Sequence, residues 1–343
     1  MQLTRLRDMA PANSPEPTLS APGDVLIKME RVGVCGSDVH YYTEGAIGTQ
    51  VVKYPFTVGH EGAGRVLEVG SAVTRVKPGD RIAFDPAMPC FQCSQCRSGR
   101  FHTCTAMKFL GCPGQADGCL SELLVMPQTS CFRVPDSLNY DEAAIVEPLS
   151  IGIYAVKLAG DVRGKAIGIT GAGPIGLCVL LPARAQGASR IYMTDKIDSR
   201  VALAREAGSD WSGNPETEDV TLAIAAAEPD GLDIVFECSG DQEAMDQALH
   251  LLRPGGKLMQ IGIPGANNRV SFDINMMRRK ELTIQNVRRQ NECVQAAIDA
   301  IAGNEFDVNV MITHHMPFER TKEAFDLVAG YRDGVVKAMI AFD

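Results

Sequence analysis

The chain has 343 residues, of which 45% are hydrophobic and 22% charged, and its net charge at pH 7 is −9. A chain of this length can form two domains, because single hydrophobic cores usually stop growing at about 250–300 residues. The acidic balance argues against a nucleic-acid partner, and no apolar run reaches the roughly 20 residues of a membrane span. Residues 1–22 lack the apolar core of a signal peptide, so we expect a cytoplasmic protein.

Residues 1 to about 148 are predicted to be rich in β-structure. Strands are expected over residues 25–32, 64–70 and 81–84, separated by glycine and proline turns. Many short strands of this kind indicate a small barrel or a partly open sheet. Residues 3–6 have the pattern of a second strand, and the strand expected before it is missing, so we expect a late start of the chain.

Cysteines supply a separate signal within this first part. The chain has 11, an odd number, and without a secretory signal this argues against a disulfide framework. Four thiolates on one loop are enough for a closed tetrahedral zinc site, which would stabilise the fold and leave no position open for substrate. Redox-active or simply buried cysteines are the alternatives. The four residues are Cys90, Cys93, Cys96 and Cys104.

From about residue 165 the pattern changes to alternating strands and helices. Strands are expected over residues 166–170, 190–194, 232–236 and 257–262, with helices after Gly176 and over residues 242–252. This alternation predicts a doubly wound parallel sheet. Pro182 falls inside the first of these helices, where it should kink or weaken it. After about residue 287 the pattern is mixed and should return to the first domain, so the predicted domains are 1–148, 149–287 and 288–343.

A glycine fingerprint opens the second part. Gly171, Gly173 and Gly176 follow a strand and begin a helix, and Asp195 ends the next strand 19 residues after Gly176. Such glycines allow a tight turn and a close approach of pyrophosphate to the helix N-terminus. Asp195 can accept hydrogen bonds from a ribose and would repel a 2′-phosphate, which favours NAD over NADP, although the adjacent Lys196 weakens that preference. A glycine-rich turn for another ligand, such as S-adenosylmethionine, is the alternative.

A second group of possible metal ligands lies near the start of the chain. Cys35, His60 and Glu61 offer a thiolate, an imidazole and a carboxylate, the donors that a catalytic zinc takes when one position stays open. On spacing alone such residues are more often structural than ligating.

The motifs together resemble the zinc-dependent medium-chain dehydrogenases. The sequence CGSD at 35–38, the sequence GHExxG from Gly59, the four-cysteine loop and the glycine fingerprint occur in that family's order and cover most of the chain. The resemblance implies a GroES-like β-rich catalytic domain and a Rossmann coenzyme domain. Residues 35–48, 147–152 and 287–288 further resemble the polyol branch, which includes sorbitol, xylitol and L-idonate dehydrogenases.

The resemblance also implies roles at the catalytic centre. Cys35, His60 and Glu61 would hold one zinc, and Glu147 would either ligate this zinc or bind its water. Two zinc ions per chain are implied, one catalytic and one structural. The positions of the alcohol-dehydrogenase proton relay match Ser37 and His40.

For substrate and cofactor, the resemblance assigns residues in both parts of the chain. Tyr41 and Arg288 would contact the hydroxyls of a sugar alcohol. Arg289 replaces an aromatic residue of the sorbitol enzymes, so the outer pocket should differ, and Arg289 could pair with the carboxylate of an aldonate. The residues assigned to NAD are Gly171, Gly173, Pro174, Ile175, Gly176, Asp195 and Arg200.

The predicted function is hydride transfer from a secondary alcohol of a polyol to NAD+, giving a ketose, with zinc as the Lewis acid. Alternatives are an L-idonate-type aldonate dehydrogenase, another secondary-alcohol or threonine dehydrogenase of the family, or an NAD-binding protein without turnover. The zinc-free quinone-reductase branch is disfavoured by the same metal ligands. The resemblance also implies a homo-oligomer, either a tetramer or a dimer.

Overall fold

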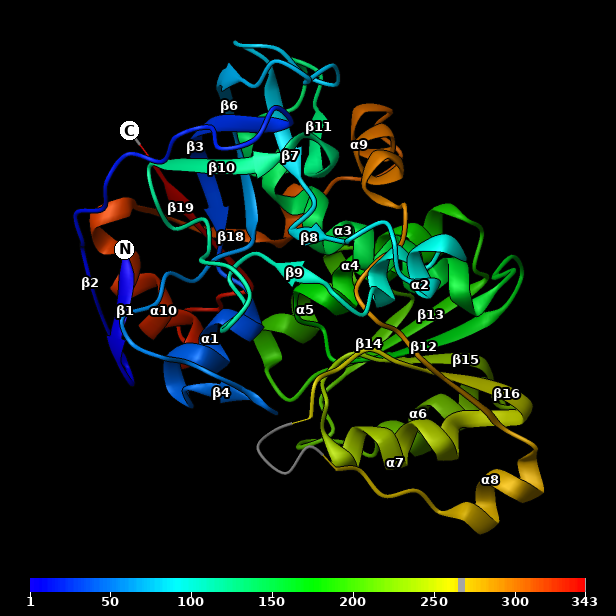
Figure 1. Ribbon diagram of the computed structural model, residues 1–343. Helices are drawn as coiled ribbons and strands as arrows, with labels where there is room; N and C mark the ends of the chain where they lie inside the picture. Colours follow the sequence, from blue (N-terminus) through cyan, green and yellow to red (C-terminus); the bar gives the residue numbers. More distant parts are fainter. Residues whose placement is uncertain (265–268, 343) are drawn as a thin grey trace. The chain divides into compact units, whose positions relative to one another are not determined.

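The computed structural model describes residues 1–264 and 269–342 (Figure 1). The chain divides into two compact units, Met1–Glu147 with Val294–Asp343, and Pro148–Cys293. The boundaries between the units fall at 147/148 and 293/294, where the sequence predicted 148/149 and 287/288. The first boundary lies within a long helix, α3 (Tyr140–Ala159), which the sequence analysis did not predict.

The main sheet of the first unit runs in the order β11-β7-β6-β3-β19-β18, with β10 also paired to β3. Its central strand, β3, alternates buried and partly exposed side chains, with Val25, Ile27 and Met29 in the core. The predicted strands over 25–32, 64–70 and 81–84 correspond to β3, β6 and β7. The strand bounds are β3 (Asp24–Gly33), β6 (Glu61–Val69), β7 (Arg81–Phe84), β10 (Leu123–Pro127), β11 (Cys131–Arg133), β18 (Ile312–Pro317) and β19 (Lys337–Ala341).

Smaller elements complete this unit. The predicted strand near the N-terminus is β1 (Gln2–Arg5), and it pairs with the strand after it, β2 (Asp8–Ala10), rather than with a missing strand before it. Short hairpins pair β4 (Ala46–Ile47) with β5 (Gln50–Val51) and β8 (Ala87–Met88) with β9 (Lys108–Phe109). The helices are α1 (Gly36–Thr43), α2 (Ser94–Arg97), α9 (Val294–Ala302) and α10 (Thr321–Ala329), with 3₁₀ turns at Phe101–Thr103, Gln128–Ser130, Asn309–Met311 and Phe318–Arg320.

The second unit is built on a parallel sheet in the order β14-β13-β12-β15-β16-β17. Numbered along the chain, this order is 3-2-1-4-5-6, that of dinucleotide-binding Rossmann domains. The predicted doubly wound sheet is confirmed. The strand bounds are β12 (Ala166–Thr170), β13 (Arg190–Thr194), β14 (Trp211–Gly213), β15 (Leu232–Glu237), β16 (Leu252–Gln260) and β17 (Thr283–Asn286).

Helices connect these strands, and aspartates begin several of them. Asp219, Asp241 and Asp273 each accept a backbone N–H at the start of the helix that follows, which satisfies donors that otherwise lack a partner. None of the helices in the described part of the chain combines the length and apolar character needed to cross a bilayer. The helix bounds are α4 (Pro174–Ala185), α5 (Asp198–Glu206), α6 (Val220–Ala227), α7 (Gln242–Leu251) and α8 (Ile274–Lys280).

Pro182 lies within α4, as the sequence predicts. Because proline has no N–H, Pro182 cannot donate the helical hydrogen bond to the carbonyl of Cys178, four residues before it. Gly152 of α3 packs against this carbonyl so closely that a Cβ on Gly152 would lie 1.8 Å from the oxygen. The contact between the two helices therefore requires a glycine at position 152.

Candidate functional site

Cys35, His60 and Glu61 come together at one edge of the first unit's sheet. Cys35 follows β3 and precedes α1, whereas His60 and Glu61 lie at the start of β6. The two strands are antiparallel and Gly33 at the end of β3 pairs with Glu61, so the end of one strand meets the start of the other. The potential ligand atoms of the three residues all lie within 4.8 Å of one another. A thiol, an imidazole and a carboxylate so close together fit a zinc ion.

Asp38 lies beside the imidazole of His60. Asp38 is fully buried, and its Oδ1 lies 3.3 Å from His60 Nδ1 and accepts the backbone N–H of Gly59 at 3.3 Å. Burial alone lowers the pKa of His60, but Asp38 and Cys35 raise it well above its ordinary value. A carboxylate on one ring nitrogen leaves the other for a metal, as is typical of zinc-binding histidines. Asp38 was not predicted from the sequence to have a role, although its place three residues after Cys35 was a usable signal.

Glu61 has a buried partner that the sequence analysis missed, Lys337. The Lys337 ammonium pairs with Glu61 Oε2 and donates to the Val34 carbonyl at 3.2 Å, and both charged side chains are at most 2% exposed. Glu61 begins β6 and Lys337 begins β19, the two neighbours of β3 in the sheet. They meet across Gly33, where an added Cβ would lie 2.5 Å from Glu61 Oε2. Gly33 therefore leaves the space in which this ion pair forms.

Glu147 is buried near the same site. Burial raises the pKa of its carboxyl to about 8, and His60, Glu61 and Asp85 are among the groups whose charges act on it. A cation bound nearby would instead lower the pKa of the Glu147 carboxyl. Glu147 lies outside the group of donor atoms formed by Cys35, His60 and Glu61. Of its two predicted roles, we therefore favour contact with a bound water over direct ligation.

The four-cysteine loop forms a second compact group. Sγ separations are 3.5 Å between Cys93 and Cys96, 3.9 Å between Cys93 and Cys104, and 3.5 Å between Cys90 and Cys104. A zinc ion bonded to four sulfurs at about 2.3 Å would hold them about 3.8 Å apart. Backbone N–H groups of Cys96 and Thr105 lower the pKa of Cys93 to about 5, which favours a thiolate ligand. The group fits a closed structural zinc.

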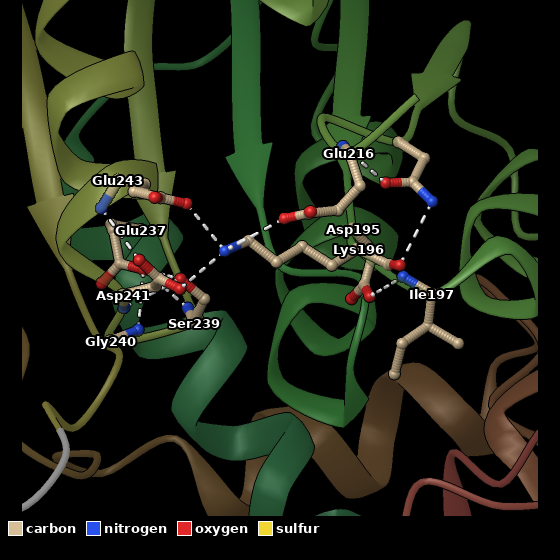
Figure 2. A network of polar contacts seen from close by, with 10 residues as sticks. Asp195, Lys196, Ile197, Glu216, Glu237, Ser239, Gly240, Asp241 and Glu243 are labelled. Carbon is tan, nitrogen blue, oxygen red and sulfur yellow. Dashed lines mark hydrogen bonds and ion pairs between the residues drawn. The ribbon is translucent and has the colours of Figure 1, made fainter. Parts of the chain in front are cut away.

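The glycine fingerprint forms the turn between β12 and α4 in the second unit. Gly171 has a φ of 94°, and a Cβ on Gly176 would lie 1.9 Å from the Gly171 carbonyl oxygen, so both positions require glycine. Asp195 braces this turn, since its Oδ2 accepts the Ala172 N–H at 2.8 Å. Its Oδ1 accepts the Ile197 N–H at 2.9 Å (Figure 2). Carboxylate oxygens have further lone pairs, so Asp195 can still accept from a ribose hydroxyl.

The helix that follows completes the candidate pyrophosphate site. Gly173 is the N-cap of α4 and Pro174 is its first residue, which leaves the N-terminal amides of the helix available to an anion. Arg200 lies beside this turn, with its Nη1 3.3 Å from the position of a Cβ on Gly173. Ile175, in the first turn of α4, is half-buried. The predicted cofactor residues thus surround one turn.

Comparison with known proteins identifies the family of the chain. Residues 21–136 match the alcohol dehydrogenase GroES-like domain, and residues 174–303 match the zinc-binding dehydrogenase family. The chain is 36% identical to the sorbitol dehydrogenase of Bacillus subtilis, over 92% of this chain and 90% of that protein. It is also 36% identical to the L-idonate 5-dehydrogenase of Vitis vinifera, over 90% of this chain and 85% of that protein. The chain belongs to the zinc-dependent medium-chain dehydrogenases.

A solved structure of the same family addresses the cofactor. A zinc-binding dehydrogenase from Sinorhizobium meliloti, determined with NADP bound, has a TM-score of 0.90 and 29% identity, and the match covers 99% of this chain and 98% of that one. The relatives place this dehydrogenase in the polyol branch, whose members act on CH–OH donors. The cofactor of this dehydrogenase is a nicotinamide dinucleotide.

Three further predicted residues of the dehydrogenase lie on α1. The Ser37 hydroxyl donates to Cys35 Sγ at 3.4 Å. Tyr41 is buried, which raises the pKa of its hydroxyl, and this hydroxyl donates to Gln50 Oε1 at 3.1 Å. His40 Nδ1 lies 2.8 Å from Glu44 Oε1 on the more exposed side of the helix. The relay role of Ser37 and His40 and the substrate role of Tyr41 stay predictions.

The two predicted substrate arginines belong to the second unit. Arg288 and Arg289 follow β17; Arg288 is exposed, whereas Arg289 is half-buried and has a φ of 51°. A positive φ is uncommon outside glycine and indicates a backbone held by its surroundings. Their contact with substrate stays a prediction.

Proposed function

We propose that this dehydrogenase oxidises a secondary hydroxyl of a sugar alcohol to the ketose, with NAD+ as the hydride acceptor. The observation that carries the proposal is the compact donor group of Cys35, which is partly exposed, with His60 and Glu61, which are buried. Similarity to the Bacillus sorbitol dehydrogenase supports a polyol as the substrate class. Assembly as a dimer or tetramer and a cytoplasmic location stay predictions from the sequence.

The metal would be held by residues that other buried groups keep in place. Cys35, His60 and Glu61 would ligate one zinc, with Asp38 fixing the imidazole and Lys337 fixing the carboxylate. A zinc ion bound there supplies a Lewis acid that lowers the pKa of the substrate hydroxyl.

The proton of that hydroxyl needs an acceptor among the residues of the chain. Glu147 suits this role, because burial raises the pKa of its carboxyl above the ordinary value and a bound cation would lower it again, so that the group can exchange a proton near neutral pH. The Ser37 hydroxyl, bonded to Cys35, is the second route, leading toward His40 and Glu44 on α1.

The cofactor would be held by the second unit. Amides at the N-terminus of α4 would bind the pyrophosphate, and the close turn at Gly171 and Gly176 leaves room for it. Asp195, already bonded to the same turn, would accept hydrogen bonds from the adenosine ribose.

The proposal is tested by following NADH formation with purified zinc-loaded protein across pentitols, hexitols, aldonates, threonine and simple alcohols. We expect turnover of a pentitol or hexitol with NAD+. Turnover of an aldonate alone would favour the L-idonate-type alternative and direct attention to Arg289. Absence of turnover across the panel, with zinc bound, would contradict the polyol assignment.

Metal removal should separate the two sites. We expect two zinc ions per chain in the purified protein, measured by elemental analysis. Brief treatment with a chelator should remove the zinc held by three protein ligands before the one held by four thiolates, because the closed site offers no open position. One zinc per chain should then remain, with activity lost and restored by added zinc. Retention of activity in chelated protein with one zinc would contradict the assignment.

A further inference from the structure

Lys196, the residue after Asp195, is surrounded by three carboxylates. Its Nζ lies 2.8 Å from Glu243 Oε2, 3.2 Å from Asp241 Oδ2 and 3.4 Å from Glu216 Oε1 (Figure 2). Hydrogen bonds to Glu243 and Asp241 raise the pKa of Lys196 above its ordinary value, so it stays protonated. The lysine that weakens the expected preference for NAD is therefore already engaged by acidic side chains.

The position of this ion cluster matters for the cofactor. Lys196 follows β13, whereas Asp241 and Glu243 follow β15, and β12 lies between these two strands. Figure 2 shows the lysine side chain extended from the loop after β13 toward the loop after β15. The cluster therefore spans the carboxyl end of β12, where the fingerprint turn begins. In Rossmann domains a dinucleotide binds at this edge of the sheet, with its ribose beside the acidic residue that ends the second strand.

The carboxylates on the β15 side are fixed by a buried anchor. Glu237 is fully buried, and its Oε1 accepts the backbone N–H groups of Ser239 at 2.7 Å and Gly240 at 2.8 Å. Asp241, the next residue, caps α7, because its Oδ1 accepts a hydrogen bond from the Glu243 N–H at 2.8 Å. Asp241 and Glu243 are therefore held in place by the loop rather than by Lys196 alone.

The charge balance of the cluster is negative. Asp195, Glu216, Asp241 and Glu243 contribute four negative charges, and Lys196 with Arg200 beside the fingerprint turn contributes two positive charges, which leaves −2. The 2′-phosphate of NADP would bring further negative charge to this edge, where like charges repel. It would also have to compete with three carboxylates for the lysine.

We propose that Glu216, Asp241 and Glu243 make this dehydrogenase discriminate against NADP, by engaging Lys196 and by adding negative charge beside the adenosine ribose. The inference deepens the proposed function and rests on it in one respect, the binding of a nicotinamide dinucleotide by the second unit. These three carboxylates are positioning residues: they act on the 2′-phosphate through Lys196 and through their charge. The same lysine would bind the 2′-phosphate in a chain without them.

The test is the double variant Asp241→Asn/Glu243→Gln in the full-length, zinc-loaded protein. Asparagine retains the capping bond of α7, so the fold should be preserved. Isothermal titration with NAD+ and with NADP+ should show the Kd for NADP+ falling about tenfold, since exposed ion pairs each contribute modestly. The Kd for NAD+ should stay within about threefold of the unmodified protein, because NAD+ lacks the charged group concerned.

Two controls identify the cause. Glu206→Gln/Asp230→Asn removes the same charge from two exposed residues, one at the end of α5 and one just before β15, and should leave the Kd for NADP+ unchanged. Adding Lys196→Ala to the test variant should remove most of the gain, because the freed lysine is the expected phosphate ligand, and only the part due to the lost carboxylate charge should remain. A gain equal to that of the control variant, or one that Lys196→Ala leaves undiminished, would overturn the inference.

The outcomes also separate the inference from the proposed function. If the unmodified protein binds NAD+ and the test variant gains no affinity for NADP+, the inference is wrong and the proposed function stands. If the unmodified protein binds NADP+ more tightly than NAD+, the inference and the choice of NAD are both wrong. If it binds neither dinucleotide, the proposed function and the inference fail together.

Discussion

His60→Ala is expected to lower polyol oxidation by about a thousandfold or more, together with the loss of one zinc per chain. The imidazole is buried, braced by Asp38, and within 4.8 Å of the donors of Cys35 and Glu61. A Lewis acid contributes several kcal/mol to the stability of the transition state, and each 1.36 kcal/mol corresponds to about tenfold in rate. The measurements are kcat/KM from NADH formation and zinc content from elemental analysis.

The matched control is His315→Gln. His315 belongs to the same unit, is about half exposed, and pairs with Asp141 away from the metal ligands. The His315→Gln variant should retain two zinc ions per chain and full activity. In His60→Ala the four-cysteine site should keep its zinc, so the count should fall to one rather than to none. Full activity of His60→Ala with two zinc ions would show that the donor group is structural.

Lys337→Met is expected to destabilise the protein by about 3 kcal/mol or more, because it leaves the buried Glu61 carboxylate without its cationic partner. The Lys337 side chain is 1% exposed and that of Glu61 is 2% exposed, so water cannot replace the lost interaction. Urea unfolding, followed by circular dichroism, measures the effect in protein from which a brief chelator treatment has removed the zinc bound by Glu61. The variant should also release zinc to a chelator faster, since Glu61 is no longer held in place.

Two companion variants make this prediction specific. Lys322→Met removes a partly exposed lysine that pairs with Asp326, and it should cost less than about 1 kcal/mol. Lys337→Met/Glu61→Gln removes both charges and should regain much of the lost stability. A cost for Lys337→Met no larger than that for Lys322→Met would contradict a buried ion pair.

The parts of the fold that depend on local sequence were predicted well. The strands at Arg81–Phe84, Ala166–Thr170 and Arg190–Thr194 have the predicted bounds, because apolar runs between glycine, proline and charged residues mark them directly. The fingerprint turn was predictable for the same reason, since its glycines, helix and following acidic residue lie within one short segment. The metal donors needed the family resemblance, because their spacing alone is ambiguous.

The parts that were missed depend on contacts between distant segments. Lys337 meets Glu61 across 276 residues, and a single lysine at the start of a strand carries no signal of burial. Helix α3 is buried on most of its faces and contains Pro148, so neither an amphipathic period nor an uninterrupted pattern marks it. Residues 3–6 had the pattern of a second strand whose partner was expected before it and was missing, whereas the short β2 after β1 supplies a partner.

The most direct test of the account is a crystal structure with anomalous scattering recorded on both sides of the zinc absorption edge. We predict two zinc peaks per chain, one among the sulfurs of the four-cysteine loop and one bound by Cys35, His60 and Glu61. A single peak at the four-cysteine loop, in protein that oxidises a polyol with NAD+, would contradict the catalytic zinc on which the account rests.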